Sequence, residues 1–182
     1  MKDLALHVMD IARNSVEARA DRVEIFFNLD KTDRKLEVCF NDNGCGMDPE
    51  MVQRVTDPYT TSRTTRKVGL GLPLLKMSAE QTGGSLNIWS QKGKGTNVTA
   101  CFFVRHLDCV PPGDLAGTAT LLITGNPNVD FRFEFRTGEE CFGIDSREIR
   151  EVLGTSEINQ PKVVRFIKEM IGENLNAIDF IY

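Results

Sequence analysis

The chain has 182 residues, of which 41% are hydrophobic and 26% are charged, a balance that is typical of a folded globular protein and excludes a disordered or fibrous chain. Its length suits one large domain or two small ones. The net charge of −4 argues against a protein that binds nucleic acid by bulk electrostatic attraction, because such proteins are usually basic.

The first half of the chain predicts helices that alternate with strands. Apolar side chains recur at helical spacing over residues 3–18, which indicates an amphipathic helix. Asp48 followed by Pro49 is a typical helix start, and the glycine pair at 83–84 is a typical helix end. In chain order we expect a helix over 3–18, strands over 22–29 and 35–42, a short helix from Asp48, a polar mobile loop over 57–68, a helix over 69–84, and strands over 85–91 and 96–104.

The composition changes at Pro111, Pro112 and Gly113, which indicates a linker or domain boundary. We therefore expect a first domain over residues 1–110 and a small α/β unit over 114–182. Within this second unit the patterns predict strands over 118–124, 130–135 and 139–144, a short helix that ends near Gly154, and a helix over 161–171. These strands either complete the sheet of the first half or form a separate module.

The N-terminal segment and the cysteines indicate the compartment. Asp3, Asp10 and Arg13 interrupt the apolar residues of the N-terminus, so it does not resemble a secretory signal. No stretch approaches the roughly 18 apolar residues of a membrane span. The cysteine count is five, an odd number, and no Cys-x-x-Cys pair occurs, which argues against a disulfide framework or a structural zinc site. We expect a cytoplasmic protein with no membrane contact.

Three short segments combine glycine with polar side chains. The first is 10–18 on the expected first helix, the second is DNGCGM at 42–47, where a strand becomes a loop, and the third is VGLGL at 68–72, which opens a helix. Each segment alone is a weak signal, because an Asn on a helix is usually a surface or cap residue and a DxGxG after a strand is usually a turn. The GxG of the third segment does not follow a strand in a βαβ unit, which argues against a dinucleotide-binding fingerprint.

Together and in this order, the segments resemble the N, G1 and G2 boxes of the Bergerat-fold (GHKL) ATPases. This superfamily contains DNA gyrase B, the MutL mismatch-repair protein, the heat-shock-ninety chaperones and the catalytic domains of histidine kinases. The GKGTN stretch at 93–97 resembles the later G3-like turn, so the resemblance covers about residues 1–105. NSVEARADRVEI and DNGCGM are similar to MutL, whereas DPYTTSR, GLGLPLLKMSAEQTGGSL and GKGTNVTACF are similar to a histidine-kinase catalytic domain.

The resemblance implies an α+β fold, in which helices cover a mixed sheet in a two-layer α/β sandwich, with a small C-terminal α/β unit. It also implies ATP and Mg²⁺ as ligands. Asp42 ends a strand, and the resemblance implies that its carboxylate accepts a hydrogen bond from the adenine amino group. Such a site rejects guanine, because guanine's carbonyl leaves the buried carboxylate unpaired. Gly44 and Gly46 let the backbone approach the base, and Met47 covers its face.

Other residues are implied to serve the phosphates. Asn14 supplies a carbonyl oxygen, a ligand suited to Mg²⁺. Gly69 and Gly71 bring N–H groups at a helix start against the phosphates, where the helix dipole favours negative charge. The further expected binding residues are Leu70 and Leu72, the loop cations Arg63 and Lys67, and Thr96, which resembles a residue on the phosphate side of the family's site. As alternatives, the two cations belong only to a solvated basic loop, and Thr96 is only a strand residue.

Asp10 is the candidate catalytic residue. The ATPase branches of the family have Glu here, four residues before the Asn, as the base for the attacking water. The shorter Asp side chain can still orient a water or accept a proton from a protein hydroxyl. As alternatives, Asp10 is a partner for Arg13 or an outer group around Mg²⁺. His7, one turn earlier, is either a helper base or a packed histidine.

We therefore expect a MgATP-binding, kinase-like ATPase, either an ATPase or a protein kinase, that acts on or regulates an unidentified partner protein in trans. His7 and His106 are the only histidines, and no helix pair carries a phospho-acceptor histidine. Two alternatives stay open: an interaction module that senses ATP or ADP with little turnover, and a slow MutL-like or gyrase-like ATPase. A redox-regulated form of the protein, in which oxidation of Cys45 blocks nucleotide entry, is a further open alternative.

Overall fold

The computed structural model describes residues 2–56, 70–153 and 158–180. In chain order the elements are α1 (Leu4–Glu17), β1 (Arg22–Asp30), β2 (Lys35–Asp42), α2 (Pro49–Val55), α3 (Gly71–Gln81), β3 (Ser85–Gln91), β4 (Gly95–Phe103), α4 (Leu115–Gly125), β5 (Asp130–Thr137), β6 (Glu140–Asp145), α5 (Ser146–Leu153) and α6 (Pro161–Ala177). The expected 57–68 loop lies outside the described residues.

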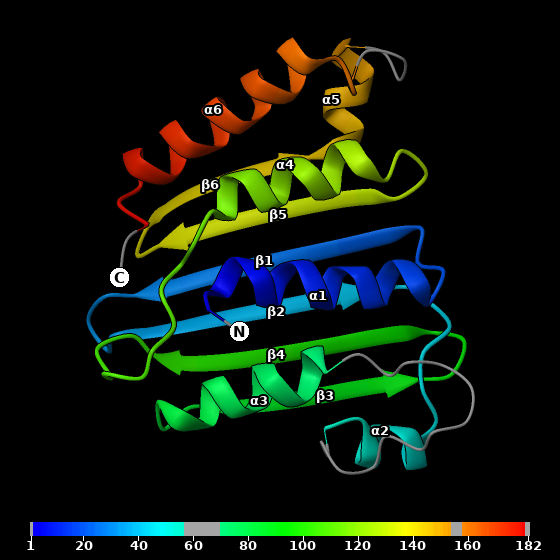
Figure 1. Ribbon diagram of the computed structural model, residues 1–182, viewed down its shortest axis with the longest axis vertical. Coiled ribbons are helices and arrows are strands. Elements are labelled where there is room, and N and C mark those ends of the chain that lie inside the picture. The colour runs from blue at the N-terminus through cyan, green and yellow to red at the C-terminus, as the bar shows by residue number, and fades with distance from the viewer. Residues whose placement is uncertain (1, 57–69, 154–157, 181–182) are drawn as a thin grey trace.

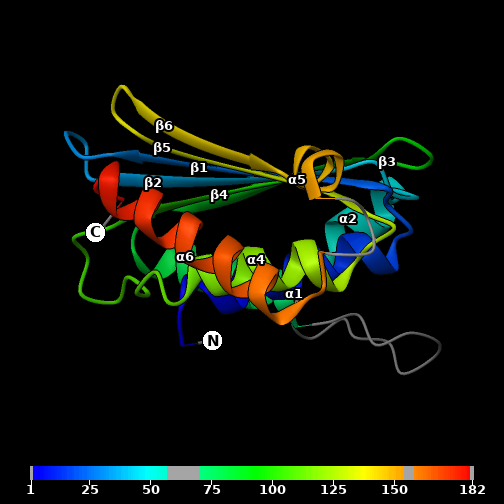
Figure 2. The same cartoon turned by 90° about the horizontal axis from the view of Figure 1, so that it is seen from above.

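The strands form one six-stranded sheet in the order β3-β4-β2-β1-β5-β6. Neighbouring strands are antiparallel except β1 and β5, which are parallel, so the sheet is mixed. Figure 1 shows α1, α3 and α4 in front of the strands, and Figure 2 shows α1, α4 and α6 on the same side of the sheet. This arrangement confirms the expected α+β class with helices over a mixed sheet.

The alternation of side chains along the strands explains why one face of the sheet is covered. In β1, β2 and β5 every second residue is buried, and the buried set is apolar apart from Thr137. Side chains on a strand alternate between the two faces, so this pattern directs one apolar face toward the helices. From the helix side, Leu4, Val8 and Ile11 of α1 are buried against it.

The C-terminal strands complete the sheet of the first half. β5 pairs with β1 over eight residues, from Arg22 opposite Asp130 to Leu29 opposite Thr137. The Phe27 and Phe135 rings stack across this junction, with centroids 4.5 Å apart. The hydrophobic core therefore runs continuously from α1 and β1 into β5. Of the two arrangements that the sequence left open, the structure has the continuous sheet.

The prediction of a strand over 118–124 was wrong, because these residues lie inside α4. Threonine and isoleucine favour strands in general, and a fully apolar run has no clear period. Here Asp114 caps the helix by accepting the Gly117 N–H at 2.8 Å. Thr120 and Thr124 donate their hydroxyls to the carbonyls four residues earlier, so the polar groups of this mostly buried helix are paired.

The remaining C-terminal predictions agree with the structure in type. The strand expected over 139–144 is β6, and the short helix after Asp145 is α5. The last expected helix continues to Ala177 rather than to 171. No helix in the described part of the chain is both long and apolar enough to cross a membrane.

The segment before α4 is bonded to the start of α1. The Leu4 N–H donates to the Pro111 carbonyl at 2.9 Å, and the Ala5 N–H donates to the Pro112 carbonyl at 3.1 Å. The first N–H groups of a helix have no partner within the helix, so these two carbonyls complete the N-terminus of α1. The Pro-rich segment thus ties the second half of the chain to the first helix.

The buried His7 generates a prediction about stability. Burial lowers the pKa of His7 from 6.5 to about 4, while the nearby Asp3 acts in the opposite direction. The unfolded chain binds this proton near pH 6.5 and the folded protein only near pH 4. The stabilisation from neutral His7 is therefore complete above pH 6.5 and is lost as the pH falls from 6.5 to 4, by about 3 kcal/mol.

When the pH is lowered from 6.5 to 4, the free energy of unfolding falls in both proteins. We expect the fall in His7→Gln to be about 3 kcal/mol smaller than in the wild type, because Gln does not titrate. The measurement is denaturant unfolding at both pH values. The difference between the two proteins isolates the contribution of the His7 side chain. An equal fall in the two proteins would contradict the neutral, buried state of His7.

Candidate active site

The Asp42 carboxylate is held from two sides. Its Oδ2 accepts a hydrogen bond from the Ser15 hydroxyl at 2.8 Å, and its Oδ1 accepts one from the Gly44 N–H at 2.9 Å. Ser15 is buried on α1, and Asp42 is the last residue of β2, where the side chain follows the helix-facing alternation of Phe40. The carboxylate therefore lies between α1 and the turn that follows β2, in a fixed orientation.

The loop that follows Asp42 is bonded to three elements. The Asn43 side-chain oxygen accepts the backbone N–H groups of Asp21 and Arg22, at 3.1 and 3.0 Å. The Cys45 N–H donates to the Ala18 carbonyl at 2.9 Å, and the Cys45 side chain is exposed. The Met47 N–H donates to the Ser90 hydroxyl at 2.8 Å, and the Met47 side chain packs on the core.

Gly46 is a position in this loop that requires glycine for its conformation as well as for space. Its φ is +63°, and a Cβ there would lie 2.0 Å from the Gln91 carbonyl oxygen. Only glycine takes this conformation at so close an approach. The loop thus packs directly on the β3–β4 hairpin.

Thr96 and Ser90 complete this end of the site. Thr96 pairs with Asp42 across β4 and β2, so the two side chains lie on the same, helix-covered face. The Ser90 and Thr96 hydroxyls are 2.9 Å apart, and Ser90 also lies 3.0 Å from the Gly95 carbonyl. Thr96 therefore belongs to the same end as Asp42, and its expected support of the phosphates stays a prediction.

A second group of residues lies where α3 begins against α1. Asp10 and Asn14 are one turn apart on the same side of α1, and both are half-buried. A Cβ on Gly71 would lie 3.3 Å from the Asp10 Cβ and 3.6 Å from the Asn14 Nδ2. Because Gly71 has no side chain, the start of α3 can lie this close to both residues.

The start of α3 presents backbone N–H groups without a side-chain cap. Leu70 at the N-cap position makes no capping hydrogen bond and is 56% exposed, whereas the Leu72 side chain is packed in the core. Among the described residues, no acceptor is found for the N–H groups of Gly71 and Leu72, and no acidic residue lies in the first turn. Free N–H groups and the helix dipole together favour an anion at such a place.

Asp10 has no ion-pair or hydrogen-bond partner among the described residues, and Arg13 is exposed. The alternative in which Asp10 pairs with Arg13 is therefore not what the structure has.

His7 is a packed histidine: it is fully buried, and its Nε2 lies 3.1 Å from the Ser78 hydroxyl of α3. The expected site residues Arg63, Lys67 and Gly69 lie outside the described residues.

Sequence reasoning missed the two serines that orient this site. Ser15 was counted only as part of the apolar face of the first helix, and Ser90 only as part of a strand. The available signal was a hydroxyl on the covered side of each element, buried at Ser15 and half-buried at Ser90. Such a group has to find a hydrogen-bond partner inside the protein, and both partners lie in the glycine loop or beside it.

The N-terminal part of the chain is similar to known proteins. Residues 2–106 match the family described as "Histidine kinase-, DNA gyrase B-, and HSP90-like ATPase". Sporulation kinase D of Bacillus subtilis is 32% identical over 92 residues, which are 50% of this chain and 18% of that protein. A putative NtrY-like sensor histidine kinase of Rickettsia conorii is 27% identical over 109 residues, 59% of this chain and 18% of that protein.

Among solved structures, the N-terminal domain of a DNA repair protein is similar, with a TM-score of 0.54 and 17% identity over 79% of this chain and 52% of that chain. This similarity concerns the fold. The chain spans about a fifth of the length of the two kinases. The family match covers more than half of the chain and includes the described site residues from Asp10 to Thr96. The protein belongs to the histidine kinase-, DNA gyrase B- and HSP90-like ATPases, and residues 2–106 are its ATP-binding domain.

Proposed function

We propose that the protein binds MgATP between α1, α3 and the loop after β2, and that it transfers the γ-phosphate to a partner protein in trans. One observation carries this proposal. The uncapped start of α3 lies against Asp10 and Asn14, while α1 also holds the Asp42 carboxylate through Ser15. Helix α1 thus contacts both the proposed base-binding end and the proposed phosphate-binding end of the site.

At the base end, the adenine amino group donates to Asp42. Ser15 and the Gly44 N–H each occupy one carboxylate oxygen, and each oxygen has a second lone pair for the base. Gly46 and Met47 form the wall of the loop beside the base, and Thr96 lies across from Asp42. Guanine presents a carbonyl in place of the amine, which this acceptor does not tolerate.

At the phosphate end, the N–H groups of Gly71 and Leu72 bind phosphate oxygens, with Gly69 and Leu70 immediately before them in the chain. Arg63 and Lys67 precede this segment and supply positive charge to the γ-phosphate.

The residues present fit a magnesium ion. The Asn14 side chain has no hydrogen-bond partner among the described residues, so its oxygen is available as a ligand. A single amide oxygen suits Mg²⁺, which usually keeps water and phosphate oxygens and few protein ligands. When bound, Mg²⁺ offsets the negative charge of the phosphates.

Asp10 is proposed as the residue that accepts a proton from the attacking hydroxyl or orients that group. It is half-buried, unpaired among the described residues, and adjacent to Asn14 and Gly71. A carboxylate without a competing partner is available for such a role.

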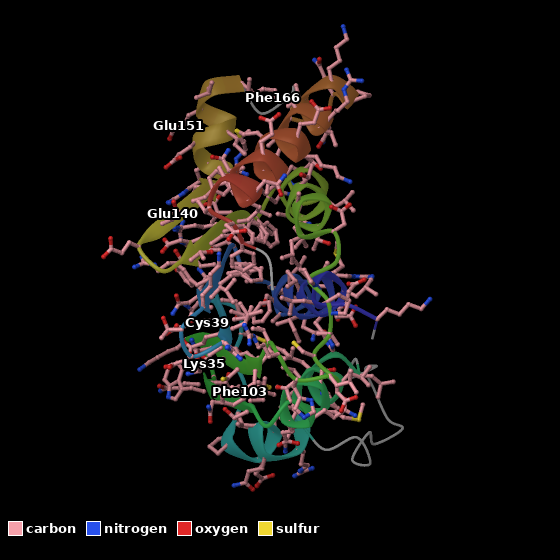
Figure 3. All side chains as sticks on the ribbon, turned by 90° about the vertical axis from the view of Figure 1, so that its left-hand side faces the viewer. Lys35, Cys39, Phe103, Glu140, Glu151 and Phe166 are labelled. Atoms are coloured by element: carbon pink, nitrogen blue, oxygen red, sulfur yellow. The ribbon has the colours of Figure 1, made fainter. Side chains whose placement is uncertain are left out.

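The acceptor is proposed to lie in another protein, because neither histidine of this chain is suited to receive the phosphate here. His7 is fully buried and bonded to Ser78. His106 follows Phe103, which pairs with Lys35 and lies near it in Figure 3. The strand register puts this pair at the end of β2 and β4 opposite to Asp42 and Thr96. Seven residue steps of β4, from Thr96 to Phe103, separate these ends by roughly 23 Å.

A nucleotide-sensing module with little turnover is the second candidate. The observation that favours it is the joining of the C-terminal half to α1 through Pro111 and Pro112, and to β1 through β5. A change at α1 that accompanies nucleotide binding reaches the second half through these bonds. The proposed compartment for either function is the cytoplasm.

Asp10→Asn tests the catalytic proposal. We expect phosphate release from MgATP to fall by at least about 100-fold, because the neutral amide cannot accept the proton. The dissociation constant for MgATP, measured by calorimetry, should stay within about threefold. Glu17→Gln, an exposed change at the end of α1, is the control and should leave both quantities unchanged. Unchanged phosphate release in Asp10→Asn would remove Asp10 as the base.

Ser15→Ala tests the base end. The Asp42 carboxylate then loses the bond that orients Oδ2, so we expect the dissociation constant for ATP to rise about tenfold. Calorimetric titration measures this change. Ser85→Ala, at the exposed start of β3, is the matched control and should bind as the wild type does. Equal affinity of Ser15→Ala and wild type would contradict the role of Asp42 as the base acceptor.

A further inference from the structure

The helices α1 and α3 make polar or close contacts at two places, which lie seven residues apart on α3 and three to seven residues apart on α1. At one place Gly71 lies against Asp10 and Asn14. At the other, the His7 Nε2 lies 3.1 Å from the Ser78 hydroxyl. Seven residues are two helical turns, or about 10.5 Å of rise. The start of α3 thus meets the later part of α1 while its end meets the first turns of α1, so the helices run antiparallel (Figure 1).

The His7–Ser78 pair is surrounded by apolar packing. Leu4, Val8 and Ile11 on α1 and Leu75 and Ala79 on α3 are all buried. Both polar side chains are buried as well, and the His7 Nδ1 has no hydrogen-bond partner in the part of the chain that the structure describes. A buried polar atom without a partner destabilises the fold, and two apolar side chains of similar shape would avoid that cost. Stability alone therefore does not explain a histidine and a serine at these positions.

A directional bond supplies what apolar packing lacks. Apolar surfaces of two helices tolerate small shifts along each other, whereas a hydrogen bond is lost within about 1 Å of such a shift. A buried polar pair in an apolar contact can fix a single alignment of two helices. Here the alignment determines where the uncapped N–H groups of Gly71 and Leu72 lie relative to Asp10 and Asn14.

We propose that His7 and Ser78 are positioning residues that set the alignment of α3 on α1, and through it the geometry of the phosphate end of the site. This inference rests on the proposed function, because it assumes that phosphates bind at the start of α3. It makes His7 neither a base nor a ligand of the nucleotide. Loss of the pair lets the start of α3 shift while the base end, which Ser15, Asp42 and Ser90 hold, stays in place.

The test compares MgATP with AMP, because both carry adenine and only ATP reaches far along the phosphate end. The variants are His7→Leu, Ser78→Ala and the double variant, with His7→Gln as the conservative variant that retains an amide to bond Ser78. Calorimetry gives both dissociation constants, and denaturant unfolding gives stability. Ile171→Ala is the control, since Ile171 is buried on α6 and packs away from the contact of α1 with α3.

In the variants that lose the pair, we expect ATP affinity to fall roughly 2- to 30-fold while AMP affinity changes by less than about twofold. His7→Gln should restore most of the ATP affinity. The double variant removes both polar groups, so it should be at least as stable as Ser78→Ala and yet keep the weakened ATP binding. Ile171→Ala should be less stable but keep the wild-type ratio of the two affinities.

A second readout does not need nucleotide. Amide hydrogen exchange in the nucleotide-free protein should become faster at Leu74, Leu75 and Lys76 in His7→Leu, and should stay unchanged in α6. An unchanged ratio of ATP to AMP affinity, or unchanged exchange in α3, would overturn the positioning role even if the wild type binds MgATP. A wild type that binds no MgATP would overturn the proposed function, and the exchange experiment would then decide the alignment role by itself.

Discussion

The packing of α1 against the sheet is the constraint on which the site depends. Leu4, Val8 and Ile11 bury one side of α1 on the apolar face of the strands. That contact fixes the rotation of the helix, so Ser15 meets Asp42 of β2 while Asp10 and Asn14 lie beside the start of α3. The helical period that buries the apolar side of α1 therefore also sets the positions of Asp10, Asn14 and Ser15. A rotation of α1 would separate the two ends of the site from their partners.

The second half of the chain is part of this arrangement rather than an addition to it. Its strand β5 continues the sheet beside β1, and the segment that leads into it bonds to the first N–H groups of α1. A helix held at its start by Pro111 and Pro112 and along its side by α3 couples three parts of the molecule. In the proposed sensing module, this connection would link the nucleotide to the C-terminal half.

The sequence predicted most of the fold because periodicity and turn residues agreed over long segments. The strands β1, β2, β3 and β4 and the helix α1 differ from their predicted bounds by one residue at most. Helix α4 was missed because threonine and isoleucine favour strands, whereas burial on several sides decides this segment. The pairing of β5 with β1 could not be predicted, since register between distant strands depends on the assembled core.

The candidate site was predicted unevenly for a related reason. Asp10, Asn14, Asp42 and Gly71 stand in motifs, so their sequence order pointed to them, and the structure brings Asp10, Asn14 and Gly71 together. Ser15 and Ser90 orient the site through contacts between elements distant in sequence, which no local pattern contains. Thr96 stood in the G3-like stretch, but its place opposite Asp42 follows from strand register alone.

The central proposal is that one site, ordered by α1, recognises adenine through Asp42 and a triphosphate through the start of α3. Calorimetric titration of the purified chain with MgATP and with MgGTP tests it most directly. The account predicts binding of MgATP with at least about 100-fold weaker binding of MgGTP, because guanine leaves the oriented carboxylate without a donor. Equal affinity for the two nucleotides, or no binding of MgATP at all, would contradict it.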